Sequence, residues 1–351
     1  MVVVPVWSSS SLEVPAWRRR LGRVRSVLAA RVYLPALLWV AGAAVLIGFG
    51  WATHWGGASY GGSVSALRII VLGPLTLALI GPILILERVR PAQRRPLVAR
   101  GHRHDILYTL LNVALVAPLV TALTLSFAEL LNRAMPWLVL PKMGVVPRWA
   151  AVAVIFVAMD GCNWFVHLAN HRVRMLWRFH ELHHSQEDLN ALSVFRTHPF
   201  LHISYVLALL PGIILLRNGA VSALLLVLYG VWVAMAHSNT NLTFGPLGRV
   251  FVSPNYHRLH HRLDGAQDVN LGFALTIWDQ LFHRAVFPTA ETVRIDTGIP
   301  GRPLAVEQEG PRPRHLAVLA AQLVGPFRPM REPVQLPTIR SASPTSSKTQ
   351  A

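Results

Sequence analysis

Long apolar runs alternate with short charged segments along most of the chain. Four runs approach the roughly 20 residues that a helix needs to cross a bilayer: 32–52, 67–86, 106–127 and 149–166. Two shorter runs follow at 203–216 and 220–236, separated by a short polar turn. The pattern predicts four transmembrane helices and a membrane hairpin that returns the chain to the side it left.

The arginines between these runs indicate an orientation. Six arginines precede the first run and six lie between the second and third, whereas the segment 53–66 contains none. Because positively charged loops remain in the cytoplasm, the N-terminus is expected there. The fourth run then emerges into the cytoplasm near His167, and the hairpin returns to the same face at His237.

The overall composition agrees with a membrane protein. Hydrophobic residues make up 53% of the chain and charged residues 14%, whereas a soluble domain carries roughly 25% charged residues. A net charge of +17 can indicate a nucleic-acid partner. The positive charges lie between apolar runs, however, so no nucleic-acid partner is expected. Cys162 is the only cysteine, which excludes a disulfide framework and a cysteine-based metal site.

These patterns predict an all-α, polytopic membrane protein with a cytoplasmic, histidine-rich helical cap. We expect four segments, namely an Arg-rich cytoplasmic N-terminus, N-terminal transmembrane helices, a catalytic domain and a Pro- and Arg-rich tail: 1–31, 32–147, 148–290 and 291–351. The tail is expected to be largely disordered because it is poor in apolar residues, with a short surface helix at 315–324.

Eleven of the sixteen histidines lie between His167 and His261. The motif HLANH spaces two histidines by four residues, and HELHH and HRLHH each space three at i, i+3 and i+4. On a helix these spacings place the side chains on one face. Neutral imidazole binds iron, zinc, copper or nickel, and eight ligands exceed the four to six that one ion holds. Two ions in one site are therefore expected.

The ordered motifs HLANH, HELHHS, RTHP, AHSN, SPNYHRLHH and DVNLGFALTIWD, over roughly 150–285, resemble the fatty acid hydroxylase and sterol desaturase superfamily. The resemblance implies an integral-membrane, non-haem enzyme that uses two iron ions and dioxygen on a lipid C–H bond. It also implies that His198 and His237 join the eight box histidines as ligands. The implied set is His167, His171, His180, His183, His184, His198, His237, His257, His260 and His261.

Asp160, Asn270 and Asp279 are expected to belong to the catalytic machinery. A ligating histidine usually donates its other ring N–H to a carboxylate or a carbonyl, so nearby acidic residues are candidate supports. Asp160 lies within the fourth apolar run, where an unpaired carboxylate is costly. Glu181, Asp188 and Asp268 are weaker candidates of the same kind, and His202 fits either a supporting or a surface position.

The expected reaction is hydroxylation or desaturation of a fatty acyl or sterol-like lipid that enters from the bilayer. The chain has no dinucleotide-binding fingerprint, so the electrons are expected from a ferredoxin-like protein or a membrane reductase. Two alternatives remain open. A metal transporter needs polar residues along its mid-span pathway, and a zinc-dependent lipid hydrolase needs about three protein ligands and an open water position.

Overall fold

The computed structural model describes residues 66–96, 99, 101–135, 137, 147–206, 219–264, 268–289, 292–299 and 315–328. Within these ranges the chain forms helices and three isolated β-bridges, and no β-strand. The predicted all-α class is confirmed for the described part of the chain.

The N-terminal half of the described chain is built from long apolar helices. In chain order these are α2 (Ala66–Val89), α3 (His102–Leu111), a π-helical segment (Asn112–Val116), α4 (Ala117–Ala134) and α5 (Arg148–Arg172). Helices α2 and α5 cover the predicted runs 67–86 and 149–166. The first predicted run, 32–52, lies outside the described residues.

The predicted run 106–127 is not one regular helix. The π-helical turn that begins at Asn112 separates α3 from α4, and the Asn112 side chain donates to the carbonyls of Tyr108 and Phe195, at 2.9 Å each. Wide turns of this kind occur where a side chain enters the backbone ladder of a helix. Asn112 thereby ties this helix to the loop that follows α6 (Arg174–His184).

The second half consists of shorter helices around the ends of the long ones. They are α7 (Pro199–Val206), α9 (Gly219–His237), α10 (Pro254–His260), α11 (Ile277–Leu281) and α12 (His315–Val324). Helix α9 contains the predicted run 220–236. Helix α12 has the bounds predicted for a surface helix, and none of its residues is buried.

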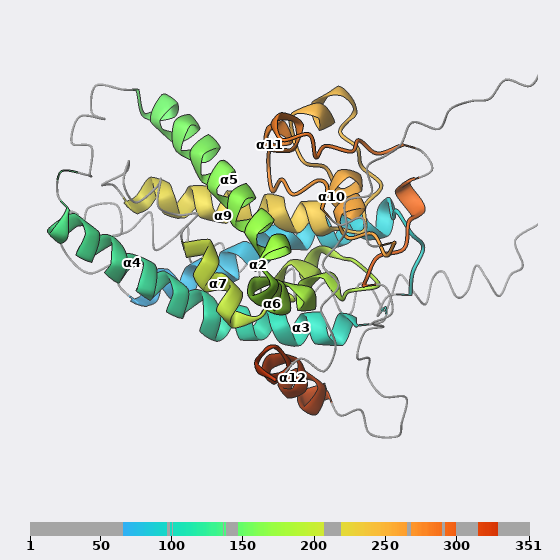
Figure 1. Ribbon diagram of the computed structural model, residues 1–351, viewed down its shortest axis with the longest axis horizontal. Coiled ribbons are helices and arrows are strands. Elements are labelled where there is room, and N and C mark those ends of the chain that lie inside the picture. The colour runs from blue at the N-terminus through green and yellow to red at the C-terminus, as the bar shows by residue number, and fades with distance from the viewer. Residues whose placement is uncertain are drawn as a thin grey trace, which may run out of the picture.

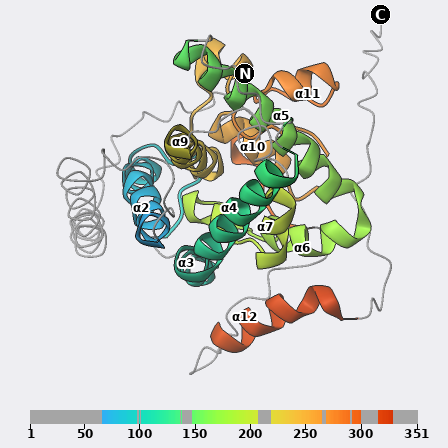
Figure 2. The ribbon, with the colours of Figure 1, turned by 90° about the vertical axis from the view of Figure 1, so that its left-hand side faces the viewer.

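Figure 1 shows α4, α5 and α9 extending to the left, with α10, α11 and their connecting loops at the opposite end of the molecule. Figure 2, turned by 90°, shows α2, α4, α5 and α9 side by side, with α12 outside them near α3 and α6. The histidine-bearing ends of α5 and α9 therefore lie where the long helices meet the loop-rich end.

One helix of the described residues, Val152–Arg172, is long and apolar enough to cross a membrane, and Val227–His237 and His315–Phe327 are shorter apolar helices. Large apolar side chains are exposed on the outer faces of α4 and α5, among them Leu119, Leu123 and Val154. Four transmembrane helices and a hairpin remain a prediction, as do the proposed segment boundaries.

Candidate metal centre

Nine of the ten predicted ligands form two groups of buried histidines. Group A contains His167, His171, His180, His184 and His260. Group B contains His183, His237, His257 and His261. Within each group the potential ligand atoms lie within 4.8 Å of one another. The groups are adjacent, because the rings of His184 and His261 stack with their centroids 4.4 Å apart.

The i, i+3, i+4 spacing divides each box between the two groups. On α6, His180 and His184 belong to group A, while His183 belongs to group B. On α10 and at its end, His260 belongs to group A, and the pair His257 and His261 belongs to group B. Helix α5 completes group A through the i, i+4 pair of HLANH, and the last residue of α9 completes group B. The spacing thus gives each of these two boxes ligands in both groups.

The Nε2 atoms of the rings converge. In group A, His180 Nε2 lies 3.1 Å from those of His167 and His171 and 3.2 Å from that of His184. His260 Nε2 lies 3.1 Å from His167 Nε2. In group B the same separations are 2.9 Å for His183–His237, 3.0 Å for His237–His257 and 3.3 Å for His257–His261.

One of these short contacts, between His167 and His260, cannot be a hydrogen bond. The Nδ1 atoms of His167 and His260 lie 2.8 Å from the carbonyl of Leu271 and 2.9 Å from that of Val269. A carbonyl only accepts, so in the neutral ring Nδ1 carries the proton and Nε2 presents a lone pair. The two Nε2 lone pairs of His167 and His260 face each other at 3.1 Å with no proton between them. A cation between the rings removes this repulsion.

The separations suit a metal ion with ligands near right angles. Two nitrogens about 2.1 Å from one ion lie about 3.0 Å apart at 90° and about 3.4 Å apart at the tetrahedral angle. Most of the observed Nε2 separations, 2.9–3.2 Å, match the first arrangement. The donor set therefore fits an ion with five or six ligands, such as iron, better than a four-coordinate ion.

The surroundings keep the imidazoles in their ligand form. Burial, followed by the neighbouring histidines, holds the pKa of the ligands on α6 and α10 well below the usual value: His180, His183, His184, His257 and His261. These rings are neutral at neutral pH, and only the neutral ring offers a lone pair to a metal. None of the nine side chains is more than 7% exposed, so the centre is shielded from bulk water.

Asp279 supports the loop behind group A. Its carboxylate accepts from Trp164 Nε1 at 2.8 Å, from Tyr256 Oη at 3.0 Å and from the backbone N–H groups of Leu271 and Gly272 at 2.9 Å each. Burial raises the pKa of Asp279 to about 6, although these hydrogen bonds lower it. Since the Leu271 carbonyl orients His167, the carboxylate acts on the ligand through the backbone.

Asp160 supports the next part of the same loop, at Ala274 and Leu275. Its oxygens accept from Tyr229 Oη at 2.8 Å, Ala274 N at 3.0 Å, and Leu275 N and Trp278 Nε1 at 3.1 Å each. This buried carboxylate is therefore fully partnered, and none of its partners is a member of group A or group B.

The structure does not bring Asp160, Asn270 or Asp279 into contact with the Nε2 atoms. All three bond to backbone groups and to side chains outside the two groups. The geometry fits the supporting contacts that the sequence analysis considered, because all three side chains form hydrogen bonds in or around the loop 268–276. Their assignment to the catalytic machinery stays a prediction.

His198, the tenth predicted ligand, lies outside both groups. Its Nε2 atom is 2.9 Å from the carbonyl of Leu323 in α12, and its ring packs against Phe179 and Phe327 with centroids 4.9 and 5.7 Å away. A nitrogen that donates to a carbonyl has no lone pair for a metal. The structure thus gives His198 a contact with α12 in place of the implied ligand role.

The weaker candidates also lie outside the two groups. Asp188 forms an ion pair with Arg95 at 2.9 Å, and Asp268 forms one with Arg172 at 2.6 Å. Glu181 is partly exposed on α6, and His202 is not one of the nine clustered histidines.

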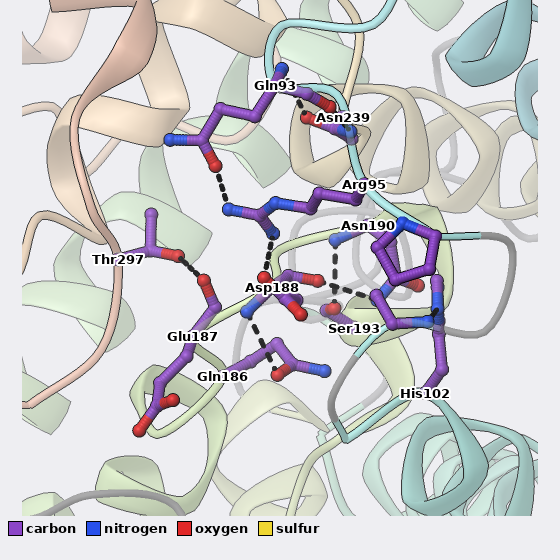
Figure 3. A network of polar contacts seen from close by, with 12 residues as sticks. Gln93, Arg95, His102, Gln186, Glu187, Asp188, Asn190, Ser193, Asn239 and Thr297 are labelled. Atoms are coloured by element: carbon purple, nitrogen blue, oxygen red, sulfur yellow. Dashed lines mark hydrogen bonds and ion pairs between the residues drawn. The ribbon is translucent and has the colours of Figure 1, made fainter.

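A polar network beside the second box was not predicted from the sequence. Figure 3 shows Arg95 reaching Asp188, whose backbone N–H donates to Gln186 at 3.2 Å, while Thr297 donates to the carbonyl of Glu187 at 2.7 Å. Beneath it, the fully buried carboxylate of Asp105 accepts from Arg196 Nε at 2.6 Å and Asn190 Nδ2 at 2.7 Å. The argument that singled out Asp160 applies equally to Asp105, because both are carboxylates beside or within an apolar run.

Comparisons with known proteins agree with this site. Residues 152–284 match the fatty acid hydroxylase family. The chain is 28% identical over 255 residues to ornithine lipid hydroxylase OlsE of Rhizobium tropici, covering 68% of this chain and 73% of that protein. It is 31% identical over 136 residues to alkylglycerol monooxygenase of Homo sapiens, covering 36% of this chain and 28% of that protein. No solved structure is significantly similar to the chain.

Proposed function

Because this chain belongs to the fatty acid hydroxylase superfamily, we propose that it is an integral-membrane oxygenase that hydroxylates or desaturates a lipid C–H bond with two iron ions. The observation that carries the proposal is the pair of adjacent groups of five and four buried histidines. Two ions held side by side, when bound, supply the joint reduction of dioxygen that attack on an unactivated C–H bond requires.

The names of the relatives favour oxygen insertion over desaturation. One is called a lipid hydroxylase and the other a monooxygenase. The matches to alkylglycerol monooxygenases span only 26–28% of those proteins. We therefore propose the class of lipid that this chain accepts and no individual lipid. We propose hydroxylation of a fatty acyl or related lipid chain.

The protein's own part is to bind, orient and shield. In three of the rings, those of His167, His237 and His260, a backbone carbonyl next to Nδ1 leaves Nε2 to face the metal, and burial keeps the imidazoles neutral. The same burial excludes water from the centre, which protects a reactive oxidant from side reactions. Electrons are proposed to come from a ferredoxin-like protein or a membrane reductase.

The proposed setting is a multi-pass membrane protein with its centre on the cytoplasmic face. Helix α5 supplies one candidate span, and group A begins at its C-terminal end. Four transmembrane helices and a hairpin, with segments 1–31, 32–147, 148–290 and 291–351, remain the proposed layout. The matched region 152–284 falls within the proposed catalytic domain.

The two alternatives have less support. A zinc-dependent hydrolase needs about three protein ligands, far fewer than the nine histidines gathered in groups A and B. A metal transporter needs a polar path through the span, whereas the grouped histidines of the long helices lie at the C-terminal ends of α5 and α9 and the others lie on α6 and at α10.

Lipid profiling combined with metal analysis tests the proposal. Membranes that contain the protein are expected to hold about two irons per chain and a lipid heavier by one oxygen than in membranes without it. A lipid lighter by two hydrogens indicates desaturation instead. One zinc per chain with hydrolysed lipid rejects the oxygenase and supports the hydrolase.

A further inference from the structure

The segment 268–272, with the sequence DVNLG, orients two ligands that come from different helices. The Val269 carbonyl faces Nδ1 of His260 on α10, and the Leu271 carbonyl faces Nδ1 of His167 on α5. Both rings belong to group A, and their Nε2 atoms lie 3.1 Å apart. One short loop therefore sets how two helices present their ligands to one ion.

The two peptide groups that carry these carbonyls are also held by hydrogen bonds from their N–H groups. The unit that carries the Val269 carbonyl donates through Asn270 N to the Arg284 carbonyl at 3.0 Å. The unit that carries the Leu271 carbonyl donates through Gly272 N to Asp279 at 2.9 Å. The orientation of one carbonyl relative to the other then depends on the backbone between them, which is Asn270 and Leu271.

Asn270 holds an uncommon backbone conformation at this point. Its φ is 55°, in the left-handed region, which side chains other than glycine rarely adopt and which asparagine tolerates best among them. Its side chain is fully buried. Nδ2 donates to the carbonyls of Tyr256 and Val286 at 2.9 and 2.7 Å, and Oδ1 accepts from Val286 N at 2.6 Å.

We propose that Asn270 is a positioning residue for group A. Its left-handed backbone and its three side-chain hydrogen bonds hold the Val269 and Leu271 carbonyls where His260 and His167 need them. The two rings then present Nε2 lone pairs to the same ion. This inference rests on the proposed metal centre. It means that the loop 268–272, together with the histidines themselves, determines how well group A retains its metal ion.

Metal retention tests the proposal with Asn270→Asp, Asn270→Ala and Asn270→Gly in the full-length protein. Aspartate tolerates the left-handed backbone but cannot donate to the two carbonyls, and alanine loses all three bonds and strains the backbone. Glycine also loses all three bonds but accepts the conformation. We expect chelator-driven loss of one metal ion to be about 10–100-fold faster in the aspartate and alanine variants, and to be intermediate between the alanine variant and the wild type in the glycine variant.

Asn112→Ala is the matched control. Asn112 is also buried and donates twice to backbone carbonyls, at 2.9 Å each, but those carbonyls orient no metal ligand. We expect this variant to unfold at a lower temperature and to release metal at the wild-type rate. The visible spectrum of the cobalt-loaded protein adds a readout of ligand geometry, which should change in Asn270→Asp and not in Asn112→Ala.

Two results overturn the proposal. The first is wild-type metal release and an unchanged cobalt spectrum in Asn270→Asp and Asn270→Ala. The second is equal acceleration in Asn112→Ala, which makes the effect one of general stability. If the alanine variant does not fold, metal release from Asn270→Gly and Asn270→Asp decides whether the proposal holds. A wild type that holds two ions but makes no lipid product rejects the proposed reaction and leaves this comparison intact. A wild type that binds no metal rejects both.

Discussion

Four buried histidines of this protein differ in which ring nitrogen meets a backbone carbonyl. His167, His237 and His260 give Nδ1 to a carbonyl and keep Nε2 for the centre. His198 gives Nε2 to the Leu323 carbonyl and lies outside both groups. Their burial is alike, so position and hydrogen-bond partner, rather than burial, distinguish His198 from the three clustered rings.

Loss of one ligand should affect one group. His183→Ala removes a ligand from group B and His260→Ala removes one from group A, so each variant is expected to fall from about two metal ions per chain toward one. Turnover should drop by more than the roughly 10–100-fold that follows loss of a supporting contact. Metal analysis and product formation in one membrane preparation measure both effects.

His283→Asn is the control for these variants. His283 is exposed, lies outside both groups and has a φ of 56°, which asparagine tolerates. It should retain metal and activity. Full iron and full activity in His183→Ala would mean that the box histidines do not bind the ions.

Asp160→Asn should weaken the fold more than the metal centre. An amide keeps one acceptor but sets N–H donors against the four donors that the carboxylate now satisfies. Leaving a buried donor without a partner costs roughly 1–3 kcal/mol. We expect a lower unfolding temperature with metal content near that of the wild type. Loss of metal at an unchanged unfolding temperature would instead place Asp160 in the centre.

At the scale of elements, the helices that carry the boxes were predictable, because histidines spaced at i, i+3 and i+4 lie on one face of a helix. The remaining features depend on contacts distant in the chain. The π-helical turn at Asn112 is bonded to Phe195, and the conformation of Asn270 depends on Tyr256 and Val286. Periodicity carries no information about such partners, so the sequence could identify these residues but could not assign their roles.

Helix α12 and the turn that follows it contact the body of the protein through individual side chains. Besides the contact with His198, Gln322 accepts from Tyr108 Oη at 3.1 Å, and His315 packs against His104 with centroids 5.3 Å apart. Phe327 in the turn packs against Phe179 and Phe200 with centroids 5.4 and 5.3 Å away. Since all of the helix's residues are at least partly exposed, each of these contacts forms a large share of what holds it in place.

His198→Ala should therefore loosen α12 and leave the metal in place. The lost hydrogen bond contributes about 1 kcal/mol, and the lost ring packing adds to it. Amide hydrogen exchange within α12 is expected to accelerate several-fold, with about two metal ions retained per chain. If the variant instead loses an ion while α12 exchanges as in the wild type, His198 is a ligand after all.

For the whole molecule, the buried imidazoles make the metal-free protein sensitive to acid. The pKa values of five ligands on α6 and α10 are well below 6.5 in the folded protein, so the unfolded chain binds more protons below about pH 6.5. Stability then falls as the pH decreases. Asp279 acts in the opposite sense, since burial raises its pKa from 3.8 to about 6, and so does Asp268, whose pKa burial also raises. The effect of the imidazoles is expected to be the larger one because all five pKa values are strongly lowered.

We therefore expect the unfolding temperature of the metal-free protein to fall steadily between pH 7 and pH 5. Metal binds only the neutral rings, so the loaded protein should show the same fall at lower pH. Thermal unfolding of both forms at pH 5, 6 and 7 provides the measurement. A metal-free protein that is as stable at pH 5 as at pH 7 would show that the clustered rings take up protons without penalty.

Helix α6 carries ligands of both groups, and so does α10 together with the residue that follows it, so the second and third boxes set the separation between the two groups. Neighbouring positions on a helix are turned by about 100° and raised by 1.5 Å, and neither value can be adjusted by a single side chain. A one-residue insertion between His180 and His183 would therefore turn His183 of group B and His184 of group A together by about 100° and leave His180 in place. The backbone geometry of the two helices thus fixes the separation of the groups, and no ligand can be moved along α6 without moving its neighbour in the other group.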